Sequence, residues 1–175
     1  MTLGDLPTII RTVPDFPKPG IQFKDITPLL QNPDAYQLVI DAFIQIARDT
    51  NATVIAGIES RGFFFACPVA IALGLPFVPI RKSGKLPWHT VSAAYALEYG
   101  EAVIEVHTDA ASPNDRVLII DDVLATGGTA HATGILINRL GATIAGYAFL
   151  MQLSFLDGAA QLTDAATYSL MDITE

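Results

Sequence analysis

Residues 116–129, RVLIIDDVLATGGT, join an apolar run to two adjacent acids and then to a turn of small residues. Residues 116–120 predict a strand, because a short continuous apolar run is typical of a parallel strand that is buried on both faces. The turn leads into a helix that we expect to reach Leu140 and to end at Gly141. A strand followed by a helix is the repeating unit of an α/β fold.

The same alternation is expected in the rest of the chain. Apolar residues between 35 and 46 recur at the i, i+3, i+4 and i+7 spacing of a buried helix face, and Asn32 or Asp34 is the expected cap. Another helix, over residues 63–73, should end at Gly74. The expected strands are 53–58, 76–80, 116–120, 142–153 and 167–171. Two prolines make residues 76–80 an edge or irregular strand. The sequence therefore predicts an α/β fold with a mainly parallel central sheet flanked by helices.

Three segments depart from this alternation. Residues 14–33 hold five of the 11 prolines, which excludes regular helix and predicts an extended or irregular cover. Residues 82–92 are polar without periodicity and predict a mobile loop. Residues 94–97 and 102–106 alternate weakly around residues 99–100 and predict a hairpin.

Composition excludes several classes of protein. The 175 residues are 51% hydrophobic and 16% charged, which argues against disorder and fibrous repeats. The net charge of −8 argues against a nucleic-acid partner. No apolar run approaches the ~18–20 residues that cross a bilayer, so we expect no membrane partner. The single cysteine, Cys67, allows no disulfide within the chain, and the three histidines lack metal-ligand spacing. We expect one soluble, cytoplasmic domain.

The turn after the strand at 116–120 predicts a phosphate site. Its backbone N–H groups and hydroxyls can surround an anion at a helix N-terminus. These residues are Ala125, Thr126, Gly127, Gly128 and Thr129. Asp121 and Asp122 cannot bind phosphate, but they suit sugar hydroxyls or a metal ion held through water. The alternative is a structural strand-to-helix turn with aspartate caps. Neither a Walker A loop nor a G-x-G-x-x-G fingerprint is present.

Two further segments carry positive charge towards the same edge of the sheet. Arg61 lies in a glycine-bracketed turn, residues 57–62, where a guanidinium beside a helix N-terminus suits a diphosphate. Arg81, Lys82 and Lys85 are three of only ten basic residues and predict a second anion site. The alternatives are a surface arginine in a turn and a solvated loop.

The region around 117–129 resembles the signature of the type I phosphoribosyltransferases. Further blocks resemble the branch of that family that acts on adenine: DFPKPGIQFKDITPLL (15–30), GIESRGFFF (57–65), RKSGKLP (81–87) and AYALEYG (94–100). The resemblance implies transfer of a phosphoribosyl group from 5-phosphoribosyl 1-diphosphate to adenine, giving AMP and diphosphate in purine salvage. It also implies Mg²⁺ held mainly by substrate and water, and a homodimer. The single domain, 1–175, would have an N-terminal hood near 1–33 and a flexible loop and hairpin near 82–107.

The resemblance also implies a role for each candidate residue. Residues 125–129 would bind the 5-phosphate, and Asp121 and Asp122 the ribose hydroxyls. Glu59, Ser60, Arg61, Arg81, Lys82 and Lys85 would bind the diphosphate, with Lys85 acting across the dimer interface. A non-proline cis peptide is expected between Glu59 and Ser60. Catalysis would use Arg61 and Glu98, the latter as general acid or base. Adenine selection would come from Ile21, Gln22, Phe23 and Lys24.

This sequence departs from the family pattern in the adenine-selecting block. Lys24 stands where many relatives carry arginine, and Gln22 where an apolar residue is common. Two alternatives therefore stay open at this point: a 6-oxopurine phosphoribosyltransferase, and a non-catalytic regulator that senses purine or phosphoribosyl diphosphate. Trp88 and His89 are also atypical and would affect loop closure rather than chemistry.

Overall fold

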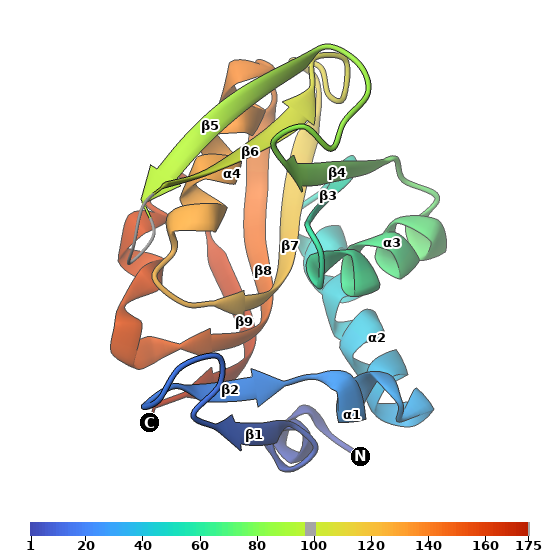
Figure 1. Cartoon of the computed structure of the whole chain (residues 1–175). Helices are drawn as coiled ribbons and strands as arrows, with labels where there is room; N and C mark the ends of the chain where they lie inside the picture. Colours follow the sequence, from blue (N-terminus) through green and yellow to red (C-terminus); the bar gives the residue numbers. More distant parts are fainter. Residues whose placement is uncertain (97–100, 175) are drawn as a thin grey trace.

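A seven-stranded sheet forms the centre of the computed structural model, which describes residues 1–96 and 101–174 (Figure 1). Its strand order is β5-β6-β4-β3-β7-β8-β9. These strands are β3 (Val54–Ile58), β4 (Phe77–Lys82), β5 (Thr90–Ala96), β6 (Glu101–His107), β7 (Arg116–Leu124), β8 (Thr143–Leu153) and β9 (Thr167–Ile173). Strands β4, β3, β7, β8 and β9 are parallel to one another, and the β5–β6 hairpin adds antiparallel strands at one side. The predicted α/β fold with a mainly parallel sheet is confirmed.

Helices cover both faces of the sheet, which explains the continuous apolar runs. The long helices are α2 (Pro33–Asp49), α3 (Gly62–Leu73) and α4 (Gly128–Arg139). Val117 and Ile119 of β7 belong to the core under α4, whereas Leu118 and Ile120 belong to the core under α2 and α3. Because successive side chains of a strand point to opposite faces, both faces must be apolar.

The helix ends follow the expected local chemistry. The Asn32 side chain accepts a hydrogen bond from the Ala35 backbone N–H at 3.1 Å and so caps α2. Gly74, with a φ of 64°, ends α3, and Gly141 adopts a φ of 84° beyond α4. These three predictions are confirmed.

The sequence predicted an edge or irregular strand over residues 76–80. The edge position is wrong for β4 as a whole, but its pairing is irregular, because residues 77–80 pair only with β3. This strand lies between β3 and β6. Its pairing with β6 is confined to Arg81 and Lys82, at its carboxyl end. Pro79 is in register with Gly57 of β3 and precedes the segment paired with β6. The missing proline N–H therefore costs no ladder hydrogen bond to β6.

The boundaries of two other predicted segments also differ from the structure. Strand β5 begins at Thr90, so the loop expected over 82–92 is shorter. Strand β7 continues to Leu124, so the two acids expected after the strand lie within it. The β5–β6 hairpin is confirmed up to the register pair Ala96 and Glu101. Residues 97–100, which include Glu98, lie outside the described residues.

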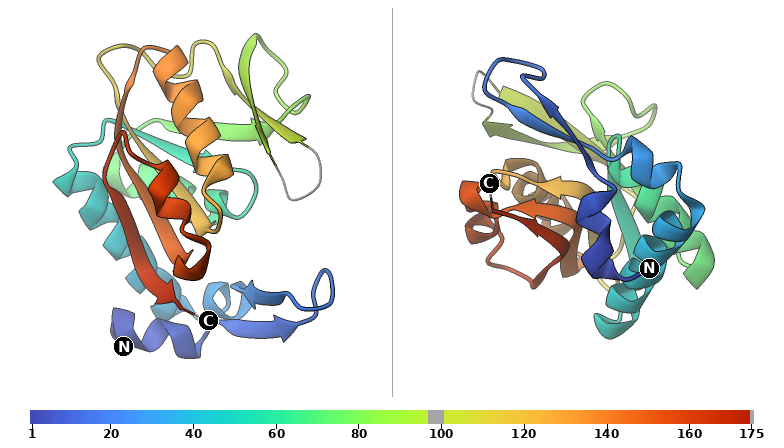
Figure 2. Two further views of the ribbon diagram at one scale, coloured as in Figure 1. Left: turned by 90° about the vertical axis from the view of Figure 1, so that its left-hand side faces the viewer. Right: turned by 90° about the horizontal axis from the view of Figure 1, so that it is seen from below.

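The proline-rich N-terminal segment is ordered by a small sheet of its own. It contains the 3₁₀ helix η1 (Leu3–Thr8), strands β1 (Arg11–Pro14) and β2 (Gln22–Asp25), and the short helix α1 (Thr27–Leu30). Strands β1 and β2 pair antiparallel. Helix α1 contradicts the expectation of no helix, and Pro28 is tolerated there because it lies in the first turn. Figure 2 shows this hairpin at the end of the molecule that also holds both termini.

Across residues 1–96 and 101–174, no helix is both long and apolar enough to span a bilayer.

Candidate active site

The loop after β7 encloses a small polar cavity. Asp121 and residues 123–130 line it, together with Phe149, and its volume is about 70 Å³. Gly127 precedes α4 with a φ of 86°, a backbone conformation that glycine adopts without strain. The cavity therefore lies at the N-terminus of a twelve-residue helix, where N–H groups and the helix dipole favour an anion. The structure brings the predicted phosphate-binding residues together here.

The shape of this loop depends on a distant glycine. A Cβ atom on Gly158 would come within 2.1 Å of the Ala125 carbonyl oxygen and 2.9 Å of the Gly127 nitrogen. A Cβ on Gly127 would in turn come within 2.4 Å of the Gly158 carbonyl oxygen. The 3₁₀ helix η3 (Gly158–Gln161) thus packs its backbone directly against residues 125–129, which we call the phosphate loop after their predicted role. Sequence analysis did not identify Gly158, because no local pattern links it to residues 125–127.

The paired acids have different surroundings. The Asp122 side chain is 5% exposed, and its Oδ2 lies 2.8 Å from Nε of Arg61. Burial raises the pKa of Asp122, and the Arg61 charge opposes this shift. Burial and the neighbouring Asp122 charge raise the pKa of Asp121 well above its ordinary value. Arg61 is therefore the positive charge that balances this acidic pair.

The turn that carries Arg61 lies against the end of β7. A Cβ on Gly62 would come within 2.9 Å of Oδ1 of Asp121, so the N-terminus of α3 and the acidic pair touch. The Glu59–Ser60 peptide bond is cis, as the resemblance implied. The Arg61 guanidinium lies 5.2 Å from the ring centre of Phe23, within the range of a cation–π contact. The turn at residues 57–62 and the acidic pair of β7 therefore form one site together with β2.

Glu59, which directly follows β3, forms an ion pair with Arg81 of the neighbouring strand β4. Glu59 Oε2 accepts hydrogen bonds from Arg81 Nε at 3.0 Å and from the Lys82 backbone N–H at 2.9 Å. The Arg81 side-chain hydrogen bond is the main cause of the lowered pKa of Glu59. The carboxylate of Glu59 is therefore engaged with the basic segment, while the contact of Glu59 with diphosphate stays a prediction.

A second, larger cavity adjoins the phosphate loop. Its volume is about 1120 Å³, and it shares Ala125, Thr126, Gly128 and Thr129 with the first cavity. Of the predicted adenine-selecting residues, Ile21, Gln22 and Lys24 line it. Phe23 contacts Arg61 and Phe16 instead.

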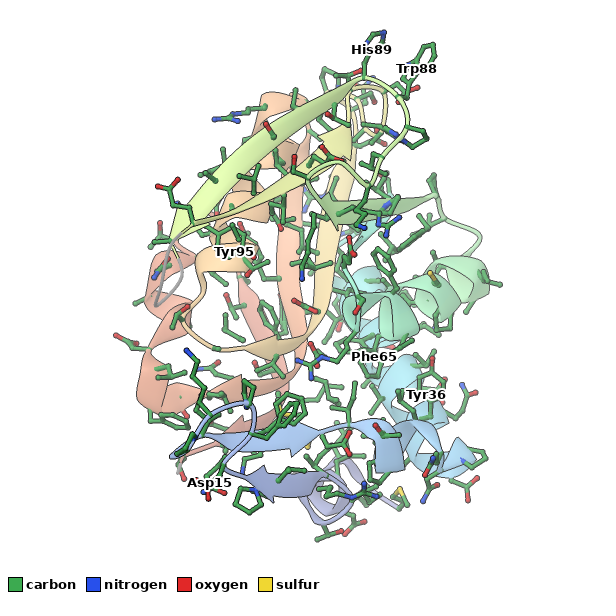
Figure 3. The ribbon with its side chains drawn as sticks, viewed as in Figure 1. Asp15, Tyr36, Phe65, Trp88, His89 and Tyr95 are labelled. Atoms are coloured by element: carbon green, nitrogen blue, oxygen red, sulfur yellow. The ribbon has the colours of Figure 1, made fainter. Side chains whose placement is uncertain are left out.

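Several lining residues of the large cavity were missed by sequence analysis. They are Tyr95, His131, Ile135, Leu153, Phe155 and Leu156. Figure 3 labels Tyr95, which lies beside the N-terminal end of α4. Phe155 is 56% exposed. Only the tertiary structure reveals this exposure, because nothing in the neighbouring sequence indicates it.

Protein ligands for a metal ion are sparse. Within the part of the chain that the structure describes, no three His, Cys, Asp or Glu side chains cluster well enough to hold a metal ion. The carboxylates at this site are Asp121, which lines the small cavity, and Asp122, which already pairs with Arg61. This donor set suits Mg²⁺ that reaches the site with most of its ligands supplied by substrate and water.

The fold and the site are those of an α/β protein that can hold an anion such as phosphate at the carboxyl edge of a parallel sheet. The family model described as "Phosphoribosyl transferase domain" matches residues 25–168, well over half of the chain. The chain therefore belongs to the phosphoribosyltransferase family.

Similar proteins narrow the assignment within this family. The adenine phosphoribosyltransferase of Anaeromyxobacter dehalogenans (strain 2CP-1) is 58% identical over 162 residues, which cover 93% of this chain and 94% of the relative. The crystal structure of adenine phosphoribosyltransferase from Thermoanaerobacter pseudethanolicus is 44% identical, with a TM-score of 0.95 over 98% of this chain and 100% of that one. The Saccharomyces cerevisiae enzyme, crystallised with an imino-altritol bisphosphate and adenine, is 40% identical, with a TM-score of 0.91 over 96% and 97%. These similarities place the chain among the adenine phosphoribosyltransferases and favour neither open alternative.

Proposed function

We propose that this chain transfers the 5-phosphoribosyl group of 5-phosphoribosyl 1-diphosphate to adenine, giving AMP and diphosphate. One observation carries the assignment of substrate to site. A small cavity at the N-terminus of α4, suited to an anion, shares lining residues with a larger cavity bordered by β2. The first fits the 5-phosphate, and the second offers room for the ribose and the purine. The yeast relative was crystallised with adenine and a bisphosphate, which supports this arrangement.

The reaction exchanges one bond at C1 of the ribose for another. The bond from C1 to the diphosphate oxygen breaks, the bond from C1 to N9 of adenine forms, and the proton on N9 is lost. Positive groups near the diphosphate stabilise the leaving group, and we assign this role to Arg61, Arg81 and Lys82. The paired acids tolerate the positive charge that develops on the ribose, and their carboxylates accept hydrogen bonds from its hydroxyls.

Mg²⁺ fits the donor set as an ion carried by the substrate. When bound, it supplies charge that neutralises the leaving diphosphate. Asp121 and Asp122 would hold it through water, since Arg61 pairs with Asp122 and the described residues form no cluster of three His, Cys, Asp or Glu side chains that could hold a metal ion.

Selection of adenine is assigned to the backbone and side chains of residues 21–24. Adenine offers an amino donor and a ring acceptor, whereas a 6-oxopurine reverses this pattern and leaves polar groups unpaired. Lys24 donates a hydrogen bond from its ammonium to the Thr12 hydroxyl at 3.2 Å. Its backbone is therefore the better candidate for reading the base.

We also propose that the protein is a cytoplasmic homodimer. The connection between β4 and β5 carries Lys85, and Trp88 and His89 of this connection lie at the end of the molecule opposite to Asp15 in the β1–β2 hairpin (Figure 3). Lys85 lines neither of the two cavities of its own chain. A second copy would let this lysine reach a partner's diphosphate.

A direct assay tests the proposed function. The protein is supplied with Mg²⁺, 5-phosphoribosyl 1-diphosphate and either adenine or hypoxanthine, and nucleotide formation is followed by chromatography. We expect AMP from adenine and no IMP from hypoxanthine. IMP formation would assign the chain to the 6-oxopurine branch, and ligand binding without turnover would assign it to a sensor.

Replacement of Glu98 by alanine tests its role as the acceptor of the N9 proton. We expect kcat to fall about 100-fold, the lower end of what general acid–base catalysis contributes, with a small change in the affinity for AMP. Steady-state kinetics and calorimetry separate the two effects. Glu101→Ala, a nearby exposed glutamate, is the matched control. An unchanged kcat would remove Glu98 from this role.

A further inference from the structure

The end of β4 and the connection from β4 to β5 are held by two carboxylates from other segments of the chain. At the end of β4, Glu59 of the β3–α3 turn accepts hydrogen bonds from the Arg81 side chain and the Lys82 backbone. Further along, Glu105 of β6 accepts hydrogen bonds through Oε1 from the backbone N–H groups of Lys85 and Leu86, both at 3.0 Å. The segment that concentrates basic residues is thus fixed at two points.

Glu105 is unusual because it is charged and buried. Only 5% of the residue is exposed, although glutamate is rarely buried without a partner. It lies in register with Arg81 across the β4–β6 pair. Burial raises its pKa, but the backbone N–H groups of Leu86, Gly84 and Lys85, together with the Thr90 hydroxyl, outweigh this effect and keep the pKa below its ordinary value.

The contacts of Glu105 lie with the loop and not with the substrate site. Neither cavity at the phosphate loop is lined by Glu105. Its oxygen instead joins two consecutive amides on a tight turn, in which the Lys85 N–H also approaches the Lys82 carbonyl oxygen at 3.3 Å. The Lys85 side chain is exposed, so the turn fixes the backbone of a lysine whose ammonium is left facing solvent.

We propose that Glu105 is a positioning residue that fixes the backbone of Lys85 and so directs the Lys85 ammonium to the diphosphate. This inference rests on the proposed function, because it assumes that Lys85 acts on diphosphate. Two charge-assisted hydrogen bonds to adjacent amides fix both the position and the direction of the lysine backbone. A lysine side chain loses much rotamer freedom when it binds, so a fixed backbone leaves less freedom to lose in the complex.

Glu105→Gln tests this coupling, and Glu101→Gln on the same strand is the matched control. The glutamine amide keeps one acceptor oxygen but removes the negative charge and the second acceptor. We expect kcat/KM for 5-phosphoribosyl 1-diphosphate to fall about tenfold, the loss expected for one weakened charge-assisted hydrogen bond, while KM for adenine stays within twofold. Glu101→Gln should leave both values unchanged.

A double-mutant cycle separates positioning from general destabilisation. Kinetics are measured for Glu105→Gln, Lys85→Ala and the double variant. If Glu105 acts through Lys85, the double variant is no worse than Lys85→Ala alone. Losses that multiply, or a Glu105→Gln variant as active as the unaltered chain, would overturn the proposal.

Amide hydrogen exchange tests the anchor without any substrate. We expect faster exchange across residues 83–89 in Glu105→Gln and no change there in Glu101→Gln. Unchanged exchange in Glu105→Gln would overturn the anchoring role even if the enzyme is active. Failure of the unaltered chain to form AMP would count against the proposed function instead, so the two failures are distinguishable.

Discussion

Replacing Arg61 by leucine is expected to weaken both the fold and the binding of diphosphate. The substitution leaves the Asp122 carboxylate, 5% exposed, without its partner at 2.8 Å. Loss of one partner of a fully buried pair costs about 3–5 kcal/mol. Because the Arg61 side chain is 38% exposed, we expect a smaller loss of about 2 kcal/mol in the free energy of unfolding. We expect kcat/KM for 5-phosphoribosyl 1-diphosphate to fall about 100-fold, since one or two charge-assisted hydrogen bonds are lost.

The pH dependence of this loss identifies its cause. The penalty belongs to the ionised form of Asp122, whose pKa burial already raises. The stability difference between Arg61→Leu and the unaltered chain should therefore shrink as the pH falls and Asp122 takes up a proton. Urea unfolding between pH 8 and pH 4 measures this difference. A difference that stays constant over that range would contradict the ion-pair explanation.

Two variants serve as controls for Arg61→Leu. Adding Asp122→Asn removes the unpaired charge and should restore most of the stability without restoring activity. Arg11→Leu breaks the exposed pair with Asp25, in which Arg11 is 61% exposed, and should cost less than about 1 kcal/mol. Equal losses from Arg11→Leu and Arg61→Leu would show that burial of Asp122 is not what matters.

Replacing Gly158 by alanine is expected to abolish most activity by displacing the phosphate loop. The new methyl group would lie 2.1 Å from the Ala125 carbonyl oxygen, far inside van der Waals contact, so the loop or η3 must move. If two N–H contacts to the 5-phosphate are lost, at about 1.5–3 kcal/mol each, kcat/KM for 5-phosphoribosyl 1-diphosphate falls about 1000-fold. Steady-state kinetics measure this loss, and calorimetry with AMP measures the matching loss of affinity.

Gly4→Ala is the control for this substitution. A Cβ at Gly4 would have the Thr2 hydroxyl oxygen at 3.7 Å as its nearest contact, so we expect no change in activity. Thermal unfolding of both variants checks that the protein remains folded. A Gly158→Ala variant that keeps AMP affinity within threefold of the unaltered chain would show that η3 does not shape the phosphate site.

Sequence analysis predicted most residues of the small cavity after β7, but not the segment η3 that packs against them. Residues 125–129 and the two acids are adjacent in the chain, so one motif reveals them together, and residues 125–129 line the same small cavity as Asp121. Gly158 and the cavity residues His131, Ile135, Phe155 and Leu156, from α4 and η2 (Ser154–Leu156), were missed, because none of them lies within a motif. Of the two positions expected for β4, edge or irregular, the edge was wrong, because the prolines indicate only which N–H groups are absent. They do not report where along the strand β6 begins to pair.

The amino-acid sequence by itself determined the local features of this protein. Continuous apolar runs identified strands buried on both faces, Asn32 and Gly74 identified helix ends, and the small residues after β7 predicted a candidate anion site, where the structure has a small cavity. Each feature depends on side chains within a few positions of one another, where backbone preference and periodicity act directly. The tertiary structure alone decided the partners of the charged groups: Asp122 with Arg61, Glu59 with Arg81, and Glu105 with the backbone of Lys85. These partners lie 20 or more residues apart, and they meet only because burial of both sheet faces fixes which strands lie side by side.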